Sequence, residues 1–415
     1  MIGTRLREVT PEVGGTAARV AVVVSHPIQH FCPLYRAIAL DGRLELKVFF
    51  GSRAGMDAYF DRHFDRSVSW GGSLLDGYGH EFLPGAESVR DPARPVSNAT
   101  LPARLDAYAP SAVVSYGWYH PIARAAYAWA RQHGARALMI SDSADNSRAD
   151  LLGLLRWRLV VPRMLREVDG FLTVGDANER FYARHGARPA QFFRSPFPVD
   201  ETSFSAASQD RRRLRTALRA RLGLTDSECL FLAVGKLTER KRIADAIRAV
   251  ARAGRGGLPV RLAIVGDGPG RSRLEALAAS QAPGLVSFAG YVAPAGLPEW
   301  YLTADVLVHP SARDHHPLAV SEAVVCELPC IVSDRVGSVG PTDDARPGVN
   351  AFVVKARDWR VLGDTMLKVA ADRQLRETMS AGSRQIAQER TMAASVEGFV
   401  RGVLAGSRRR TESKP

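Results

Sequence analysis

The sequence predicts an α/β protein of two domains, each built around a parallel β-sheet. Short apolar segments of strand length alternate with amphipathic segments of helix length in two successive blocks. The chain has 415 residues, and single domains usually stop growing at about 250–300 residues, so two cores are expected. Hydrophobic residues make up 46% and charged residues 24% of the chain, as in ordinary soluble globular proteins.

The first block contains five expected strands separated by helix-like segments. They are Val20 to Ser25, Leu44 to Phe50, Ser111 to Gly117, Ala137 to Ser143 and Phe171 to Gly175. We expect them to form an N-terminal domain over residues 18–200. Residues 1–17 lack apolar periodicity and are predicted to be disordered.

The second block contains six expected strands. They are Cys229 to Gly235, Arg261 to Gly266, Val286 to Gly290, Asp305 to Pro310, Cys330 to Asp334 and Ala351 to Val354. A linker over residues 201–224, with an arginine-rich helix predicted to be solvated, leads into a C-terminal domain over residues 225–382. A final helix is expected over residues 383–405, followed by a disordered basic tail over residues 406–415.

Two carboxylates flank a predicted loop-to-helix junction in the second block. Asp314 and Glu322 have seven residues between them, and the apolar segment that follows the loop has the length of a covering helix. Pro317 suits the first helical position, because its missing N–H would be unpaired there in any case. Helical side chains lean toward the N-terminus of the helix, so Glu322 is expected to point at the strand ends where α/β sheets bind ligands.

This segment resembles the retaining glycosyltransferases of family four, which have the GT-B fold of two facing Rossmann-like domains with a cleft between them. Their signature is two Glu residues with seven residues between them. Here Asp314 stands at the first position and Glu322 at the second, while Pro317 replaces a usual glycine. The resemblance implies that Asp314 lies beside the donor sugar and that Glu322 accepts hydrogen bonds from the nucleotide ribose. It also assigns His316 and Leu318 to donor binding.

Two lysines follow the first strand of the second block. Lys236 comes directly after the strand and Lys241 at the expected start of the next helix, where the helix dipole favours phosphate. The family usually has Arg followed five residues later by Lys, so the resemblance implies that both lysines stabilise the leaving diphosphate. Two surface lysines at a strand-to-helix turn are the alternative.

The resemblance also covers IVGDGPG and VSFAGYV. Gly266 lets the backbone approach a ligand, although the spacing differs from the dinucleotide-binding GxGxxG pattern. Tyr291 is expected beside the nucleotide base, with core packing as an equally weighted alternative.

Polar and aromatic side chains follow three strands of the first block. His26, Gln29 and His30 follow the first strand, Trp118 and His120 follow another, and Asp142 follows a third. Aromatic rings stack on the apolar faces of sugars, so we expect this group to bind the acceptor and His120 to belong to the catalytic set. Capping and loop hydrogen bonds are the alternative for the histidines.

No metal or other cofactor is expected to be required. His315, His316, Cys326 and Cys330 are a conceivable metal cluster, but Cys326 falls inside an expected helix and Cys330 opens an expected strand. Buried free cysteines are the preferred interpretation. The paired lysines and the helix dipole can neutralise a leaving diphosphate without a metal ion.

The net charge of +13 and a pI near 10.0 indicate an anionic partner. A nucleotide sugar and an anionic membrane surface both satisfy this, and no nucleic acid is expected. Residues 148–168 mix arginines with leucines and Trp157, and they are predicted to pack on their own sheet or to lie in a membrane interface. Since no apolar run approaches about 18 residues, the expected location is the cytoplasm, with peripheral membrane attachment possible.

Together these features predict a retaining glycosyltransferase that moves a sugar from a nucleoside-diphosphate sugar to an acceptor hydroxyl. Retention comes from the resemblance alone, which also implies that part of residues 383–404 crosses back onto the first domain. The acceptor would be a carbohydrate, a lipid-linked compound or a small molecule, in polysaccharide, glycolipid or glycoconjugate synthesis. A non-catalytic GT-B scaffold at a membrane and a GT-B sugar-nucleotide epimerase are the alternatives.

Overall fold

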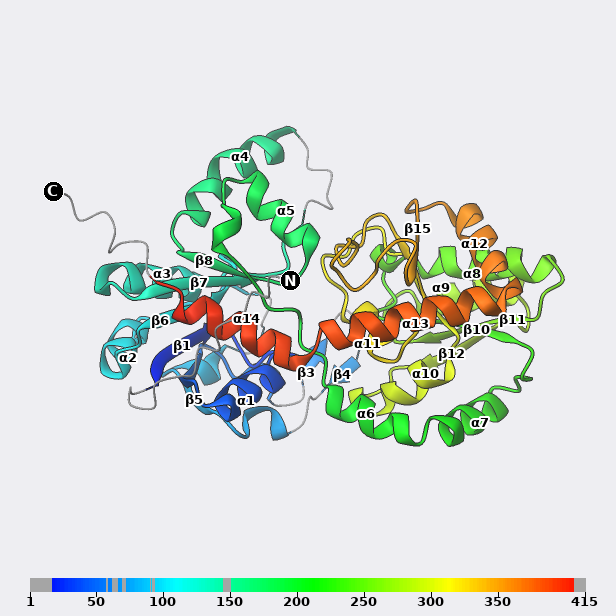
Figure 1. Ribbon diagram of the computed structural model, residues 1–415, viewed down its shortest axis with the longest axis horizontal. Coiled ribbons are helices and arrows are strands. Elements are labelled where there is room, and N and C mark those ends of the chain that lie inside the picture. The colour runs from blue at the N-terminus through cyan, green and yellow to red at the C-terminus, as the bar shows by residue number, and fades with distance from the viewer. Residues whose placement is uncertain are drawn as a thin grey trace, which may run out of the picture.

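Two parallel β-sheets, each covered by helices, form the two halves of the molecule (Figure 1). This computed structural model describes residues 17–56, 59–61, 66–68, 72–89, 91, 94–144 and 151–406. The disorder predicted for the two termini falls largely on residues 1–16 and 407–415, which lie outside the described residues.

The N-terminal sheet has seven strands in the order β5-β2-β1-β6-β7-β8-β9, and all its pairings are parallel. The strands are β1 Ala18–Val24, β2 Leu44–Phe50, β5 Gly79–Phe82, β6 Ala112–Tyr116, β7 Arg136–Ser141, β8 Gly170–Thr173 and β9 Phe192–Arg194. The apolar pattern predicts five of them and misses β5 and β9, which are short and lie at the sheet edges. A separate antiparallel pair joins β3 Tyr59–Asp61 to β4 Arg66–Val68.

The C-terminal sheet has six strands in the order β12-β11-β10-β13-β14-β15, again all parallel. They are β10 Cys229–Val234, β11 Val260–Val265, β12 Val286–Gly290, β13 Val306–His309, β14 Cys330–Ser333 and β15 Ala351–Val354. The predicted fold class, two Rossmann-like domains with parallel sheets, is therefore confirmed.

Helices cover both faces of each sheet, which explains why the strands are apolar without alternation. In β1, Val20, Val22 and Val24 pack into one core layer, while Ala21 and Val23 pack into the layer on the opposite face. The N-terminal helices are α1 Cys32–Asp41, α2 Leu101–Tyr108, α3 Pro121–His133, α4 Leu151–Leu165 and α5 Asp176–Arg184. The C-terminal helices are α8 Ile243–Arg255, α9 Arg271–Gln281, α10 Leu297–Thr303, α11 Leu318–Val325, α12 Trp359–Ala371 and α13 Arg373–Glu389.

The predicted linker is helical and packs on the second domain. It consists of α6 Glu201–Gln209 and α7 Arg211–Arg221, and α7 lies against α10. The expectation of a solvated helix is wrong for one face of α7, where Arg219 is only 3% exposed. Arg215 and Arg219, one helical turn apart, both pair with the Asp305 carboxylate, at 2.8 and 3.5 Å.

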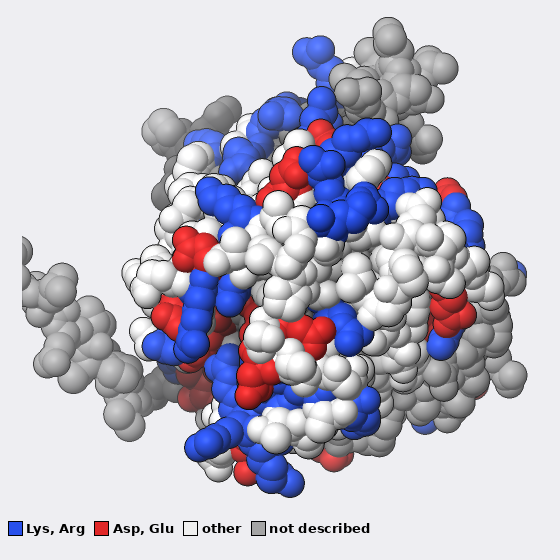
Figure 2. Space-filling model, turned by 90° about the vertical axis from the view of Figure 1, so that its right-hand side faces the viewer, with Lys and Arg blue, Asp and Glu red and all other residues white. Residues whose placement is uncertain are grey.

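The helix α4 buries Val161 and Leu165 in the first domain, as expected if this segment packs on its own sheet. Leu159 and Val160 are 52% and 42% exposed. The side chains of residues 151–157, Trp157 among them, lie outside the described part of the chain. No helix among the described residues combines the length and apolar character that crossing a bilayer requires. On the face shown in Figure 2, which is formed by the C-terminal domain, basic side chains cover more of the surface than acidic ones.

The single helix expected over residues 383–405 is two helices. The helix α13 ends at Glu389, and α14 Met392–Leu404 begins after a short interruption. Thr391 caps α14, its hydroxyl accepting a hydrogen bond from the Ala394 N–H at 3.1 Å. Whereas α13 lies along the C-terminal domain, α14 lies along the N-terminal domain (Figure 1) and packs against α1, β8 and β9. Phe399 and Val400 join the first domain's core, so this helix pair ties the two halves together.

Gly398 sets how closely α14 approaches β9. A Cβ atom at this position would lie 1.8 Å from the Arg194 carbonyl oxygen, which is backbone and cannot yield as a side chain would. We expect Gly398→Ala to lower the free energy of unfolding by about 1–3 kcal/mol through overpacking, measured by urea unfolding. Gly406→Ala is the control, because its Cβ would meet no atom within 4 Å. Equal stability of the two variants would contradict the close approach.

Candidate functional site

The order of strands reverses once in each sheet, between β10 and β13 and between β1 and β6. The chain leaves these neighbouring strands toward opposite sides, so the loops after them part and leave a crevice where α/β sheets bind ligands. The loops that follow β10 and β13 carry Lys236, Lys241 and Asp314. The loops that follow β1 and β6 carry the predicted acceptor-binding histidines and Trp118.

An ion pair joins the two loops of the C-terminal domain. The Lys241 Nζ atom lies 2.5 Å from Asp314 Oδ2, and both side chains are largely buried. The same oxygen lies 2.9 Å from His309 Nε2. Burial opposes ionisation of Asp314, but the His309 hydrogen bond and the Lys241 charge outweigh it and hold the pKa of Asp314 below its usual range. Because burial lowers the pKa of His309, a neutral imidazole donates this hydrogen bond near pH 7.

Lys241 lies at the end of a 3₁₀ turn, Glu239–Lys241, and not at the start of α8 as predicted. Its side chain runs beside Gly235, where an added Cβ would lie 3.6 Å from Lys241 Cε. Gly235 and Gly266 both have positive φ, 145° and 140°, and a Cβ on Gly266 would lie 2.0 Å from the Gly235 carbonyl oxygen. Glycine is therefore required at Gly266 for the two turns to pack together. Lys236, half-buried, follows directly after Gly235.

Glu322 lies in the second turn of α11. This helix begins at Leu318, one residue later than predicted, because Pro317 has the extended conformation of an N-cap and is not the first helical residue. The fully buried Tyr301 donates its hydroxyl to Glu322 Oε2 at 2.6 Å. Burial raises the pKa of Glu322. The sequence did not reveal this partner, since Tyr301 stands in an apolar helix segment that reads as ordinary core.

A hollow of about 600 Å³ lies between the domains and gathers six of the predicted site residues. Its lining includes Gln29 and His30 from the first domain and Gly266, Tyr291, Leu318 and Glu322 from the second. Cys32, Pro33 and Arg36 of α1 also line the hollow, as does the segment Pro198 to Phe204. The predicted cleft is thus present, and residues assigned to donor and acceptor face one another across it.

His26, His30 and His120, on the loops after β1 and β6, are neutral near pH 7. Burial lowers the pKa of His26 and of His30 to about 4, and it also lowers the pKa of His120. His120 Nδ1 accepts a hydrogen bond from the Val96 N–H at 3.1 Å, so the ring proton of neutral His120 is on Nε2. His26 Nδ1 lies 2.9 Å from Ser25 Oγ. These rings can offer hydrogen bonds to a ligand without carrying positive charge.

Eight of the predicted site residues are not part of the lining of the interdomain hollow, namely Lys236, Lys241, Asp314, His26, Trp118, His120, Asp142 and His316. The Trp118 ring stacks on Phe181 within the first domain, with centroids 6.5 Å apart. Asp142 Oδ1 lies 3.9 Å from His315 Nδ1 across the domain boundary. His316 is buried, with Nε2 3.1 Å from Asp344 Oδ2.

His316 belongs to a buried ionic cluster between the domains. Its nitrogens and the carboxylates of Asp343 and Asp344 lie within 4.8 Å of one another, as metal ligands would. The Arg390 guanidinium pairs with both carboxylates, which supplies the positive charge that a metal ion would bring. Burial opposes ionisation of Asp344, but Arg390 and His316 outweigh it and hold the pKa of Asp344 below its usual range. Asp343 Oδ2 accepts the Asp176 N–H from the first domain at 2.7 Å.

The other residues of the conceivable metal cluster lie elsewhere. Cys326 and Cys330 are free and buried. Burial raises the pKa of both thiols, so neither is a ready thiolate ligand.

Comparison with known proteins finds glycosyltransferases that are similar to part of the chain. Residues 215–386 match the family described as "Glycosyl transferases group 1". The chain is 28% identical over 303 residues to a D-inositol 3-phosphate glycosyltransferase of Geodermatophilus obscurus, covering 70% of this chain and 62% of that protein. It is 30% identical over 245 residues to a GDP-mannose-dependent alpha-(1-6)-phosphatidylinositol dimannoside mannosyltransferase of Mycobacterium tuberculosis, covering 55% of this chain and 60% of that protein. The chain thus spans less than two thirds of the length of these relatives.

A solved structure shows the same fold. The Anabaena protein HepE, crystallised in complex with UDP, superposes with a TM-score of 0.69 at 14% identity, covering 93% of this chain and 99% of that chain. The likeness extends over both domains and shows the GT-B fold.

The buried cluster predicts a strong dependence of stability on Arg390. We expect Arg390→Met to lower the free energy of unfolding by about 3–5 kcal/mol, because it leaves two buried carboxylates without their cation. The exposed Arg384, which pairs with Glu327, is the matched control, and Arg384→Met should have little effect. Urea unfolding at about pH 7 measures both.

The difference in free energy of unfolding between the native chain and Arg390→Met should also become smaller as the pH falls. In the native chain the depressed pKa of Asp344 contributes stability above the pKa of an unfolded aspartate, and this contribution is lost as the pH drops through the folded pKa. In Arg390→Met the uncompensated carboxylates are relieved by protonation. If this difference in free energy of unfolding were as large at about pH 4 as at about pH 7, the ionic origin of the effect would be contradicted.

Proposed function

We propose that the chain, whose residues 215–386 match the glycosyl transferases group 1 family, transfers a sugar from a nucleoside-diphosphate sugar to an acceptor hydroxyl with retention of configuration. The observation that carries the proposal is the Lys241–Asp314 pair on the loops at the strand-order reversal of the C-terminal sheet. The Lys241 side chain runs beside Gly235, which lines the interdomain hollow together with Glu322. An ammonium and two carboxylates beside one interdomain hollow suit a ligand that has a diphosphate, a ribose and a sugar.

The donor is proposed to lie along the C-terminal wall of the hollow. Tyr291 lies beside the base, and Leu318 packs against the nucleoside. Glu322, with one oxygen held by Tyr301, accepts hydrogen bonds from the ribose hydroxyls. Gly266 lets the backbone approach the diphosphate closely, since any side chain there would collide with Gly235. His316, buried in the ionic cluster, supports the donor loop and does not touch the ligand in this arrangement.

The chemistry follows from charge placement. Lys236 and Lys241 neutralise the diphosphate as it departs, and Asp314 orients the sugar. The acceptor oxygen bonds to the anomeric carbon on the face from which the diphosphate leaves, the bond from that carbon to the diphosphate oxygen breaks, and that oxygen takes the acceptor proton. Asp314, ionised because its pKa is depressed, also stabilises the positive charge that develops on the sugar ring. No metal ion is required for these steps.

The acceptor is proposed to approach from the N-terminal wall. His26, Gln29, His30 and His120 offer uncharged hydrogen-bonding groups there, and Trp118 and Asp142 lie on neighbouring loops. The names of the two relatives, which act on an inositol phosphate and a phosphatidylinositol dimannoside, support an acceptor rich in hydroxyl groups. A cytoplasmic location is part of the proposal. The exposed Leu159 and Val160 near Arg158 and Arg163 support peripheral contact with an anionic membrane if the acceptor is lipid-linked.

Removal of the ammonium beside the leaving group tests this assignment. We expect Lys241→Ala to lower kcat by about 100-fold to 1,000-fold, because the departing diphosphate loses its nearest counter-charge. Lys368→Ala, which removes an exposed lysine of α12, is the matched control. Release of nucleoside diphosphate in the presence of acceptor measures both. Near-normal turnover of Lys241→Ala would refute the assignment.

Nucleotide binding gives a second test that needs no acceptor. Calorimetry with a panel of nucleoside diphosphates should find one that binds, and Glu322→Gln should weaken it about tenfold because charge-assisted hydrogen bonds to the ribose are lost. Tyr301→Phe should weaken it in the same direction, while Glu377→Gln on the outer helix α13 should not. Binding of none would favour a non-catalytic scaffold. Conversion of the donor's sugar without acceptor would favour an epimerase.

A further inference from the structure

A second hollow, strongly basic, adjoins the loop that carries Asp314. Its volume is about 630 Å³ and it lies among the loops that follow β10, β13, β14 and β15. Its lining is Glu239, Arg240, Arg242, Ala312, Arg313, Asp334, Arg335, Lys355, Ala356 and Arg357. Arg240 and Arg313 directly precede Lys241 and Asp314 in the sequence, so the basic hollow begins beside the proposed sugar site.

Most of the positive charge in this hollow is uncompensated. Arg242 is held by Asp245 at 2.8 Å, and Glu239 faces Arg273 at 3.4 Å. The five remaining cations, Arg240, Arg313, Arg335, Lys355 and Arg357, form no salt bridge with any residue in the described ranges. Four of the five are exposed and Arg335 is half-buried. Like charges that converge without partners repel one another, so an anionic ligand would stabilise the group.

The floor of the basic hollow is fixed by backbone hydrogen bonds. The Ala312 N–H donates to the Arg240 carbonyl at 2.8 Å, and the Asp314 N–H donates to the Arg335 carbonyl at 3.0 Å. The Ala356 N–H donates to Asp334 Oδ1 at 2.8 Å. The loops that present the cations are therefore joined to one another and to the Asp314 loop, which reduces the ordering cost of ligand binding.

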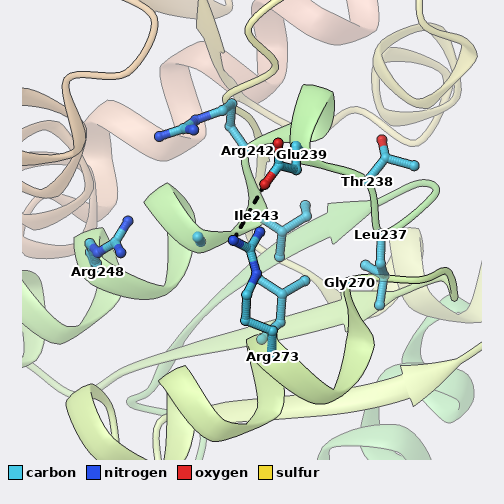
Figure 3. A pocket seen from close by; sticks show the side chains of 10 residues that line it. Leu237, Thr238, Glu239, Arg242, Ile243, Arg248, Gly270 and Arg273 are labelled. Carbon is cyan, nitrogen blue, oxygen red and sulfur yellow. Dashed lines mark ion pairs between the residues drawn. The ribbon is translucent and has the colours of Figure 1, made fainter.

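A smaller basic hollow continues the charged surface. Glu239 and Arg242 line both this smaller hollow and the basic hollow described above, and the smaller hollow is also lined by Arg248 and Arg273. Figure 3 shows Arg273 reaching toward Glu239, with which it pairs, while Arg242 points away from that carboxylate. The cations of this smaller hollow are paired with Asp245 or Glu239, so the unpaired positive charge lies in the larger basic hollow.

We propose that the basic hollow binds anionic groups carried by an extended acceptor glycan, such as carboxylates, sulfates or phosphates along its chain, while the acceptor's terminal hydroxyl lies at the sugar site. This inference rests on the proposed glycosyl transfer. In the proposed donor arrangement Tyr291 and Glu322, which line the interdomain hollow, mark its nucleoside end. The basic hollow, which adjoins the Asp314 loop at Arg313, then lies beyond the sugar. Six cations, the carboxylates of Glu239 and Asp334 and two alanines line it, without the projecting apolar side chains by which proteins enter a membrane interface.

The test compares binding by two charge variants of the full chain. Arg335→Gln/Lys355→Gln removes two of the cations, and Arg212→Gln/Arg255→Gln removes two exposed arginines at α7 and at the far end of α8. The probe is a heparin-derived oligosaccharide, with a neutral maltooligosaccharide for comparison. We expect the first variant to bind the sulfated probe about tenfold more weakly at moderate salt. The second variant should bind it like the native chain, and both should unfold at the native temperature.

Three other results would overturn the proposal, and a fourth would separate it from the proposed transferase function. Equal weakening in both variants would show binding by overall charge alone. Parallel loss of nucleoside diphosphate affinity in the first variant would assign the hollow to the donor. If the first variant no longer bound phosphatidylglycerol vesicles but bound the sulfated oligosaccharide like the native chain, the hollow would be a lipid-binding site. If the native chain binds the sulfated probe but no nucleoside diphosphate, the basic hollow stands as a glycan site while the proposed transferase function fails.

Discussion

The reversal of strand order in each sheet is the constraint on which the rest of the structure depends. Parallel strands end at one edge, and only where neighbouring strands lead to opposite sides do their following loops separate. In the C-terminal sheet this places Lys241 and Asp314 on different loops yet within 2.5 Å of each other. In the N-terminal sheet it places the His26 to His30 loop beside His120. The order of the strands therefore brings these four loops together, whatever side chains the loops carry.

The two crevices form one site only if the domains keep facing each other, and buried charge holds them there. Asp176 of α5 meets Asp343 and Thr342, Arg390 pairs with both Asp343 and Asp344, and α14 carries the chain back onto β9. Each of these carboxylates is costly to bury alone, so the arrangement is stable only as a set. The set therefore specifies one relative placement of the domains more sharply than an apolar contact of the same size would.

Much of this fold could be predicted from the sequence, because continuous apolar runs such as Val20 to Val24 are typical of strands buried on both faces. The edge strand β5 carries only one large apolar residue, Phe82, so its pattern gives no such signal. Within the site, the spacing of Asp314 and Glu322 indicated a ligand-binding junction. Tyr301 and His309, which hold those carboxylates, escaped notice since each stands in an apolar segment and its partner is set by tertiary packing. The Asp176–Asp343 contact joins residues far apart in the chain, and no local pattern encodes it.

Net charge is informative here only after the paired cations are set aside. Many arginines are already neutralised by a neighbour, as Arg215 and Arg219 are by Asp305 and Arg252 is by Asp364. Those side chains build the fold and attract little. Five cations that form no salt bridge within the described ranges lie together on loops at the carboxyl ends of β10, β13, β14 and β15, the edge at which the topology creates the site. A field concentrated there acts on ligands entering the cleft, whereas the same charge spread over the surface would act on every anion alike.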